Sequence, residues 1–402
     1  MQTTNELSDI IANIEPSLTM NITALANRLR SEGKDVIGFG AGEPDFDTPE
    51  AIKEAGIAAI SSGKSKYTPA AGLPELKAAI IERCRLDYGV SYEPSEVVVS
   101  CGAKHSLNNA FLAILNPGDE VLVASPYWVS YPEQIQLAGA KMVTVETNAD
   151  TDFKMNVSQL SALKTDRTRA LVLNSPSNPT GSVYTKDELI LISNWAVDNG
   201  LWIISDEIYD KLTYSNYEHI CVASLSDAIK ERTILVNGVS KTYAMTGWRI
   251  GYLMAPQVIA GAIARMQSHT TSNPTSISQY AAIEALTMDQ AVLNDMRQVF
   301  DRRRVLMIDT LQVIPGISIN QPTGAFYAFP KIDALFGKTT THGKKITNSM
   351  TFCELLLEEA NVACVPGIGF GSEGYMRLSY ATSDENIETG LARINDWVIG
   401  LT

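Results

Sequence analysis

Short β-rich runs alternate with helical stretches between about residues 95 and 255, and this alternation constrains the fold more than any other feature of the chain. The β-rich runs are EVVVS (96–100), EVLVASP (120–126), KMVTVE (141–146), RALVLNSP (169–176) and LWIISDE (201–207). Helical patterns separate them, among them a helix from Ala103, YWVSYPEQIQLAG and TKDELILISNWAVDNG. This order is typical of an α/β fold with a doubly wound, mostly parallel sheet that helices cover on both faces.

The rest of the chain predicts more strands, connecting helices and a second unit. Two further β-rich runs, TILVNG (233–238) and RIGYLMAP (249–256), extend the sheet. After Pro256, about fifty residues have helical spacing, which predicts one or two long connecting helices. The last part combines strand-like GISIN (316–320), AFYAFP (325–330) and MRLSYA (376–381) with helical TFCELLLEEA (351–360) and a closing amphipathic helix. It predicts a smaller α+β unit.

Net charge limits the partners of the chain. Its 402 residues are 45% apolar and 19% charged, which is an ordinary globular composition. With 32 Lys and Arg against 45 Asp and Glu, the formal net charge of −13 opposes non-specific attraction to nucleic acid or to an anionic membrane. We expect neither as a partner, so an anionic ligand must be captured locally.

Cysteine and histidine usage argues against disulfides and metals. The five scattered cysteines form no CxxC pair, so we expect reduced thiols. The four histidines form no HExxH or comparable pairing, so we expect no metal site. The N-terminus lacks a basic stretch followed by an apolar core, and no run approaches the roughly 18 apolar residues that span a bilayer. These features predict a cytoplasmic protein without a membrane partner.

The residues that follow each predicted strand are the candidate site, because ligands of open α/β sheets bind beyond the carboxyl ends of the strands. These positions hold acids, bases, amides and aromatic rings, each after a different run. They are Gly102, Ala103 and Lys104, then Trp128, Asn178, Asp206 and Tyr209, then Ser240 and Lys241, with Arg249 eight residues beyond Lys241.

Two of these positions, taken alone, can also be interpreted as ordinary structural features without a role in binding or catalysis. A helix that opens at 102–104 would present free N–H groups to a phosphate, although such a triplet is more often a tight turn with a surface lysine. Lys241 would project a partly desolvated amine that can form a Schiff base, although a single lysine is usually a surface residue. The strand-end acid, aromatic residue and arginine around it favour the reactive amine. No GxGxxG is present, which disfavours an NAD-dependent dehydrogenase.

Six motifs in register resemble one known family. GAGEPDFDTP, YTPAAGLPELK, NSPSNPTG, SDEIYDKL, SKTYAMTGWRIGY and MRLSYATS look like the fold-type I, class I aminotransferases that use pyridoxal 5′-phosphate (PLP), in their bacterial aspartate aminotransferase branch. The match runs in order from about Pro16 to the C-terminus. The resemblance implies a large PLP domain and a smaller α+β domain. We expect the N-terminal arm and part of the small domain in 1–45, the large domain in 46–295 and the rest of the small domain in 296–402.

The resemblance gives the central chemistry to two residues. The lysine of SKTYAMTGWR holds the cofactor aldehyde covalently, which puts this role on Lys241. Once an amino acid displaces it, its amine becomes the base that takes the Cα proton. The acid of SDEIY, Asp206, would pair with the pyridine nitrogen and keep it protonated, so that the ring accepts electrons. Outside such a family, an acidic residue at a strand end usually caps a helix or a turn.

Further cofactor contacts follow from the same resemblance. Tyr209 and Asn178 would hydrogen-bond the phenolic oxygen of the cofactor and stabilise its anion, and Trp128 would stack on its ring. Without the resemblance, Tyr209 would be interpreted as a tyrosine of the core and Asn178 as an asparagine in a turn. The phosphate would be bound by the Gly102–Ala103–Lys104 turn, by Ser240 and Arg249, and by Tyr67 of the other subunit.

Substrate contacts are implied as well. Arg377 of MRLSYA matches the arginine that grips the α-carboxylate, helped by the backbone of Gly42 and flanked by Trp128 and Asn178. In the bacterial branch the distal carboxylate is bound by a lysine that matches Lys104. Hydroxyl groups that match Ser17 and Thr19 of the N-terminal arm assist it.

The resemblance therefore implies a homodimer with shared active sites that transfers an amino group between L-aspartate and 2-oxoglutarate, giving oxaloacetate and L-glutamate. One departure keeps an alternative open. The second arginine that animal and enteric-type enzymes use for the distal carboxylate has no confident match around TTSNPTS. A glutamate/aspartate-prephenate or broader aromatic aminotransferase is thus the alternative, and a lyase or decarboxylase on the same scaffold is a further one. A regulator that binds the cofactor without catalysing a reaction is disfavoured, because Lys241, Asp206 and Arg377 are all present.

Overall fold

A seven-stranded sheet organises the first two thirds of the chain. The computed structural model describes residues 8–16, 18–215 and 217–402. Its large sheet consists of β2 (Val97–Ser100), β3 (Glu120–Ser125), β4 (Lys141–Glu146), β5 (Thr168–Asn174), β6 (Trp202–Asp206), β7 (Thr233–Gly238) and β8 (Gly251–Met254). The spatial order is β2-β8-β7-β6-β5-β3-β4, and β8 runs antiparallel to both of its neighbours while the other pairs are parallel. The two late strands, β7 and β8, insert between β6 and β2 instead of extending an edge.

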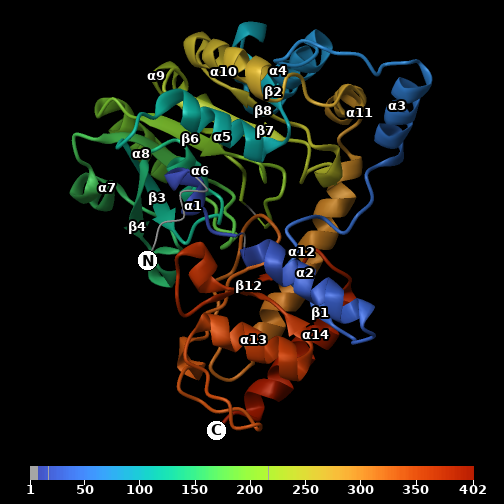
Figure 1. Ribbon diagram of the computed structural model, residues 1–402, viewed down its shortest axis with the longest axis vertical. Coiled ribbons are helices and arrows are strands. Elements are labelled where there is room, and N and C mark those ends of the chain that lie inside the picture. The colour runs from blue at the N-terminus through green and yellow to red at the C-terminus, as the bar shows by residue number, and fades with distance from the viewer. Residues whose placement is uncertain (1–7, 17, 216) are drawn as a thin grey trace.

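Helices cover both faces of this sheet (Figure 1). One face packs against α5 (Ala103–Ile114), α6 (Tyr131–Leu137) and α10 (Gln257–Thr270). The opposite face packs against α4 (Pro74–Tyr88) and α11 (Ser276–Thr287) near β2, and against α7 (Val157–Leu163) and α8 (Lys186–Asp198) near β5. In β2, Val98 faces α5 while Val97 and Val99 face α4. A strand buried on both faces explains the unbroken valine run, and the predicted doubly wound α/β fold is confirmed.

The stretch after β8 holds three helices, so the prediction of one or two was wrong in number. α10, α11 and α12 (Val292–Leu311) follow one another. Pro274 stands in the break between α10 and α11, and a proline disfavours the helical conformation of the residue before it. α12 then runs from the large sheet into the C-terminal part of the molecule (Figure 1).

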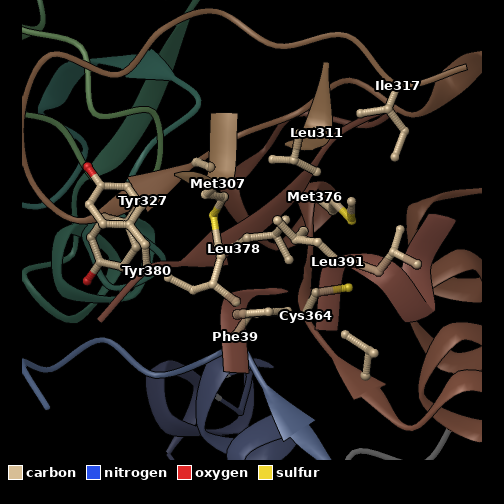
Figure 2. Close-up of a cluster of buried hydrophobic side chains, with 14 of the residues drawn as sticks. Phe39, Met307, Leu311, Ile317, Tyr327, Cys364, Met376, Leu378, Tyr380 and Leu391 are labelled. Carbon is tan, nitrogen blue, oxygen red and sulfur yellow. The ribbon is translucent and has the colours of Figure 1, made fainter. Parts of the chain in front are cut away.

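Two small sheets and three helices form that C-terminal part. β9 (Tyr327–Ala328), β11 (Val365–Pro366) and β12 (Met376–Ser379) form an antiparallel sheet, and β1 (Ile37–Gly38) pairs in parallel with β10 (Val362–Ala363). The helices around them are α2 (Leu18–Ser31), α13 (Ser349–Ala360) and α14 (Asp384–Ile399). GISIN is not a strand: Ser318 makes one isolated bridge to Lys331, which also bridges to Tyr375. Figure 2 shows the shared core, to which Phe39 from the N-terminal segment belongs together with Met376 and Leu391.

Short elements complete the chain. α1 (Asp9–Ala12), α3 (Glu50–Ser61) and α9 (Asp227–Lys230) are the remaining α-helices of the described residues. The segment after α1 contacts α6, because Glu133 accepts a hydrogen bond from the backbone N–H of Glu15 over 3.3 Å. Within the described ranges, no helix is both long and apolar enough to cross a membrane.

Candidate active site

A cavity of about 460 Å³ opens at the carboxyl ends of the large sheet, where the sheet meets the C-terminal part. Strands β2, β3, β5, β6 and β7 run in the same direction and end at this edge, which brings together residues that are far apart in the sequence. The predicted site residues that line the cavity are Gly42, Ala103, Lys104, Trp128, Asn178, Asp206, Tyr209, Ser240, Lys241, Arg249 and Arg377. Gly40, Glu43, Asn174, Thr246 and Tyr327 line it as well, and the sequence had given none of them a role.

Gly102 and Tyr67 are not among the residues that line the cavity. Gly102 is the N-cap of α5, directly behind the cavity wall, with φ of 86°. A Cβ at this position would lie 2.6 Å from Arg249 Nη2, so only glycine lets the arginine pack against the helix start. Tyr67 is 92% exposed and is not among the lining residues of its own chain. Thr19 lies in α2 and Ser17 lies outside the described residues.

Asp206 is a buried carboxylate at the end of β6, and only 4% of its surface is exposed. It accepts a 2.7 Å hydrogen bond from the Tyr131 hydroxyl and a longer one, 3.4 Å, from the backbone N–H of Ile208. Among the described residues, no cation lies within ion-pair distance of it. Burial raises the pKa of Asp206 to about 6, against the lowering effect of the Tyr131 hydrogen bond.

Lys241 follows β7 and projects its amine into the cavity. Its Nζ donates a hydrogen bond to the carbonyl oxygen of Gly42, which joins the sheet edge to the N-terminal segment. Burial lowers the pKa of Lys241 to about 8, and the nearby Glu43 carboxylate opposes that shift. A lysine of this kind releases its proton far more readily than an exposed one.

Arg377 enters the cavity from β12 and is 2% exposed. Its Nη1 donates to Asn178 Oδ1 over 3.0 Å and its Nη2 donates to the Gly40 carbonyl over 2.8 Å. The Nε atom is buried and has no hydrogen-bond partner among the described residues. Burial lowers the pKa of Arg377 from its ordinary value, yet the group remains cationic. Among the described residues, no carboxylate lies within ion-pair distance of this buried guanidinium, and such a group suits an anionic ligand.

The Arg377 guanidinium also lies over two aromatic rings. Its central carbon is 4.5 Å from the ring centre of Tyr327 and 5.0 Å from that of Phe370. The Tyr327 hydroxyl in turn lies 2.8 Å from the hydroxyl of Tyr209, and either one can be the donor. Burial raises the pKa of Tyr209 well above its ordinary value, so its proton is available for donation.

The opposite wall carries two more cations. Lys104 Nζ lies 5.0 Å from the ring centre of Trp128, a cation–π contact, and Arg249 Nη1 donates to the Thr246 carbonyl over 2.8 Å. Four cationic side chains therefore face the cavity, against two acidic ones, in a chain whose formal net charge is −13. The excess of positive charge suits a ligand with several anionic groups.

Sequence reasoning missed Tyr131 and Tyr327, which contact Asp206 and Tyr209. Tyr131 starts α6, and Tyr327 lies in the two-residue strand β9. Each is one aromatic residue in an apolar segment, a pattern that is typical of core packing. No signal in the sequence distinguishes them.

The chain matches a model of the family described as aminotransferase class I and II over residues 34–394. It belongs to that family. Its relatives include an aspartate aminotransferase of Geobacillus stearothermophilus, 48% identical over 97% of this chain and 98% of the relative. An aspartate/prephenate aminotransferase of Cereibacter sphaeroides is 45% identical over 98% of this chain and 99% of the relative. The solved structure of a Thermus thermophilus aspartate aminotransferase with maleate superimposes with a TM-score of 0.91 at 42% identity. The match covers 97% of this chain and 99% of the Thermus chain.

This family assignment confirms the predicted resemblance, the enzyme class and the cofactor: the aminotransferase uses PLP. It also removes the dehydrogenase alternative.

Proposed function

We propose that this aminotransferase transfers the amino group of L-aspartate to 2-oxoglutarate, giving oxaloacetate and L-glutamate. The observation that carries the proposal is the pair of cationic groups in one cavity, Arg377 and Lys104, which suits a substrate with two carboxylates. Relatives named aspartate aminotransferase, at 48% and 46% identity, support it.

The residues present fit PLP. Asp206, buried without a cation, would hold the protonated pyridine nitrogen, and Tyr209 with Asn178 would hold the phenolic oxygen. The first turn of α5 behind Gly102 offers free N–H groups to the phosphate, together with Ser240 and Arg249. Trp128 would cover one face of the ring and Lys241 would hold the aldehyde covalently.

When bound, PLP supplies an electron sink for the electron pair that remains when Cα of the amino acid loses its proton. The protein supplies the proton transfer and the binding. Lys241 Nζ, with a pKa of about 8, would take the proton from Cα of the amino acid and would return it to the carbon on the other side of the amino nitrogen. Asp206 keeps a proton on the pyridine nitrogen, because a buried carboxylate favours a cationic partner.

Substrate orientation would depend on both carboxylates. The Arg377 fork would take the α-carboxylate, since its buried Nε lacks a partner among the described residues and its Nη atoms are held by Asn178 and Gly40. Lys104 would take the distal carboxylate as a point charge above Trp128, with Thr19 and Ser17 as further candidates.

A second candidate is an aspartate/prephenate aminotransferase. Its support is the 45% identical Cereibacter sphaeroides relative of that name, together with the chemistry of Lys104. An ammonium selects less strictly for carboxylate geometry than a guanidinium does, so it tolerates a bulkier side chain between the two carboxylates.

We also propose a homodimer with shared sites. Tyr67 is 92% exposed and does not line its own cavity, which supports a role at the phosphate of the partner subunit. Ile57 and Ile60 of α3 are 60% and 61% exposed, and such apolar surface favours association. A mixture of one chain with Lys241→Ala and one with Tyr67→Ala would contain hybrid dimers with one intact site. Recovered activity in that mixture supports the shared site, and a strictly additive loss refutes it.

We propose that 1–45 and 296–402 move together over 46–295 and exclude water when a dicarboxylate binds. The free state of all five cysteines supports a cytoplasmic location, since thiols persist in reducing compartments.

An absorption experiment tests the proposed function. Purified protein with PLP should show the visible band of the covalently bound cofactor, and L-aspartate without an oxo acid should convert it to the band of pyridoxamine phosphate. Addition of 2-oxoglutarate should then restore the first band. A band that aspartate leaves unchanged would refute the substrate, and prephenate with aromatic amino acids would be tested next. Turnover without an oxo-acid acceptor would indicate a lyase or decarboxylase instead.

A further inference from the structure

Tyr327 connects two parts of the cavity that the proposed function uses separately. Its hydroxyl lies 2.8 Å from the Tyr209 hydroxyl, and its ring lies 4.5 Å below the Arg377 guanidinium. It is 1% exposed, so the protein holds it in one orientation. Figure 2 shows it at one end of the C-terminal core.

The hydroxyl protons determine the direction of this contact. A tyrosine hydroxyl has one proton to donate and also accepts hydrogen bonds. If Tyr209 donates its proton to the phenolic oxygen of the cofactor, its own oxygen can only accept from Tyr327. The Arg377 charge lowers the pKa of both hydroxyls, but its guanidinium lies 4.5 Å from the ring centre of Tyr327, while burial holds the pKa of Tyr209 well above its ordinary value; Tyr327 is therefore the better donor.

We propose that Tyr327 is a positioning residue that donates a hydrogen bond to Tyr209 Oη, aims the Tyr209 proton at the phenolic oxygen of PLP, and couples this contact to Arg377. The proposal rests on the proposed function, because it requires Tyr209 to bind the cofactor oxygen. Hydrogen bonds in such a chain polarise one another, so the Tyr327 hydroxyl strengthens the donation by Tyr209.

The substitution Tyr327→Phe tests this chain. It keeps the ring below Arg377 and removes only the hydroxyl. Other charged groups near the two hydroxyls are Arg377, Asp206, Glu43 and Lys241, and the substitution alters none of them.

The measured quantity is the pH midpoint of the visible absorption change of the bound cofactor. Weaker donation to the phenolic oxygen leaves more negative charge there, which favours the protonated form and raises the midpoint. We expect Tyr327→Phe to raise it by roughly half a pH unit, the size of a modest loss of hydrogen-bond cooperativity. A midpoint equal to that of the unsubstituted enzyme overturns the proposal.

Tyr380→Phe is the matched control. Tyr380 is buried in the same core, its hydroxyl donates to the Ala325 carbonyl over 3.3 Å, and it does not line the cavity. We expect an unchanged midpoint, and an equal shift in this variant would show that Tyr327 acts only through core packing.

A double substitution separates positioning from a direct effect. If Tyr327 acts through Tyr209, Tyr327→Phe should give no further shift in a Tyr209→Phe background. A second shift of full size refutes the route through Tyr209. If the unsubstituted protein with added PLP shows no visible band at all, the proposed function fails first. A normal band with no effect of Tyr327→Phe refutes only this further inference.

Discussion

Asp206 should destabilise the cofactor-free protein, because it is a buried carboxylate with no cation of the described residues within ion-pair distance. Its pKa rises from the ordinary 3.8 to about 6. The native state therefore keeps a proton that the unfolded state releases between about pH 4 and pH 6, so stability falls as the pH rises through this range. A shift of this size corresponds to about 3 kcal/mol at pH 8.

The variant Asp206→Asn removes this charge. Its amide oxygen can still accept from Tyr131, but the weak bond from the Ile208 N–H is lost, at a cost of about 1 kcal/mol. The net gain for the cofactor-free variant is then about 2 kcal/mol at pH 8. At about 2.1 cal/mol/K of unfolding entropy per residue, this gain raises Tm by roughly 2 to 3 °C for a chain of 402 residues.

Thermal unfolding of the two cofactor-free proteins measures the effect. We expect Asp206→Asn to melt higher than the unsubstituted protein at pH 8, with a gain that shrinks as the pH falls from 6 towards 4. Asp166→Asn, at an exposed carboxylate, is the control and should change little. Added PLP should reverse the order, since only the carboxylate can pair with a protonated pyridine nitrogen. An Asp206→Asn protein that melts at or below the unsubstituted one at pH 8 would refute this reasoning.

Three further substitutions test other parts of the site. Arg377→Lys loses the N–H groups that donate to Asn178 and Gly40. It should lower kcat/KM for aspartate by at least about 30-fold in steady-state assays while the PLP band stays intact. Unchanged kinetics would contradict the role of Arg377 at the α-carboxylate. Gly102→Ala forces a side chain into φ of 86° and onto Arg249, at a cost of about 1 to 3 kcal/mol, so PLP should dissociate faster on dialysis. Lys104→Met keeps the contact with Trp128 without the charge and should raise KM for both dicarboxylates about tenfold while sparing aromatic amino acids.

Much of the fold could be predicted from the sequence, because periodicity and strand-end position are local properties. Every β-rich run of the large sheet forms a strand at the expected place. The position of β8 could not be predicted, since it depends on which strand edges remain free after folding. GISIN fails as a strand for a similar reason: a strand needs a regular neighbour, and Ser318 faces an irregular segment around Lys331.

The sequence by itself determined which chemical groups stand at the strand ends, Lys241, Asp206 and Asn178 among them, because a strand and the residue after it are contiguous. Only the tertiary structure decided what surrounds them. Tyr131 lies 75 residues from Asp206 and Tyr327 lies 118 residues from Tyr209, yet each pair shares a hydrogen bond. The pKa values near 6 and 8 of Asp206 and Lys241 likewise arise from burial, which no single segment carries. Hydrogen bonding and desolvation act through space, so they exist only once distant segments have packed together.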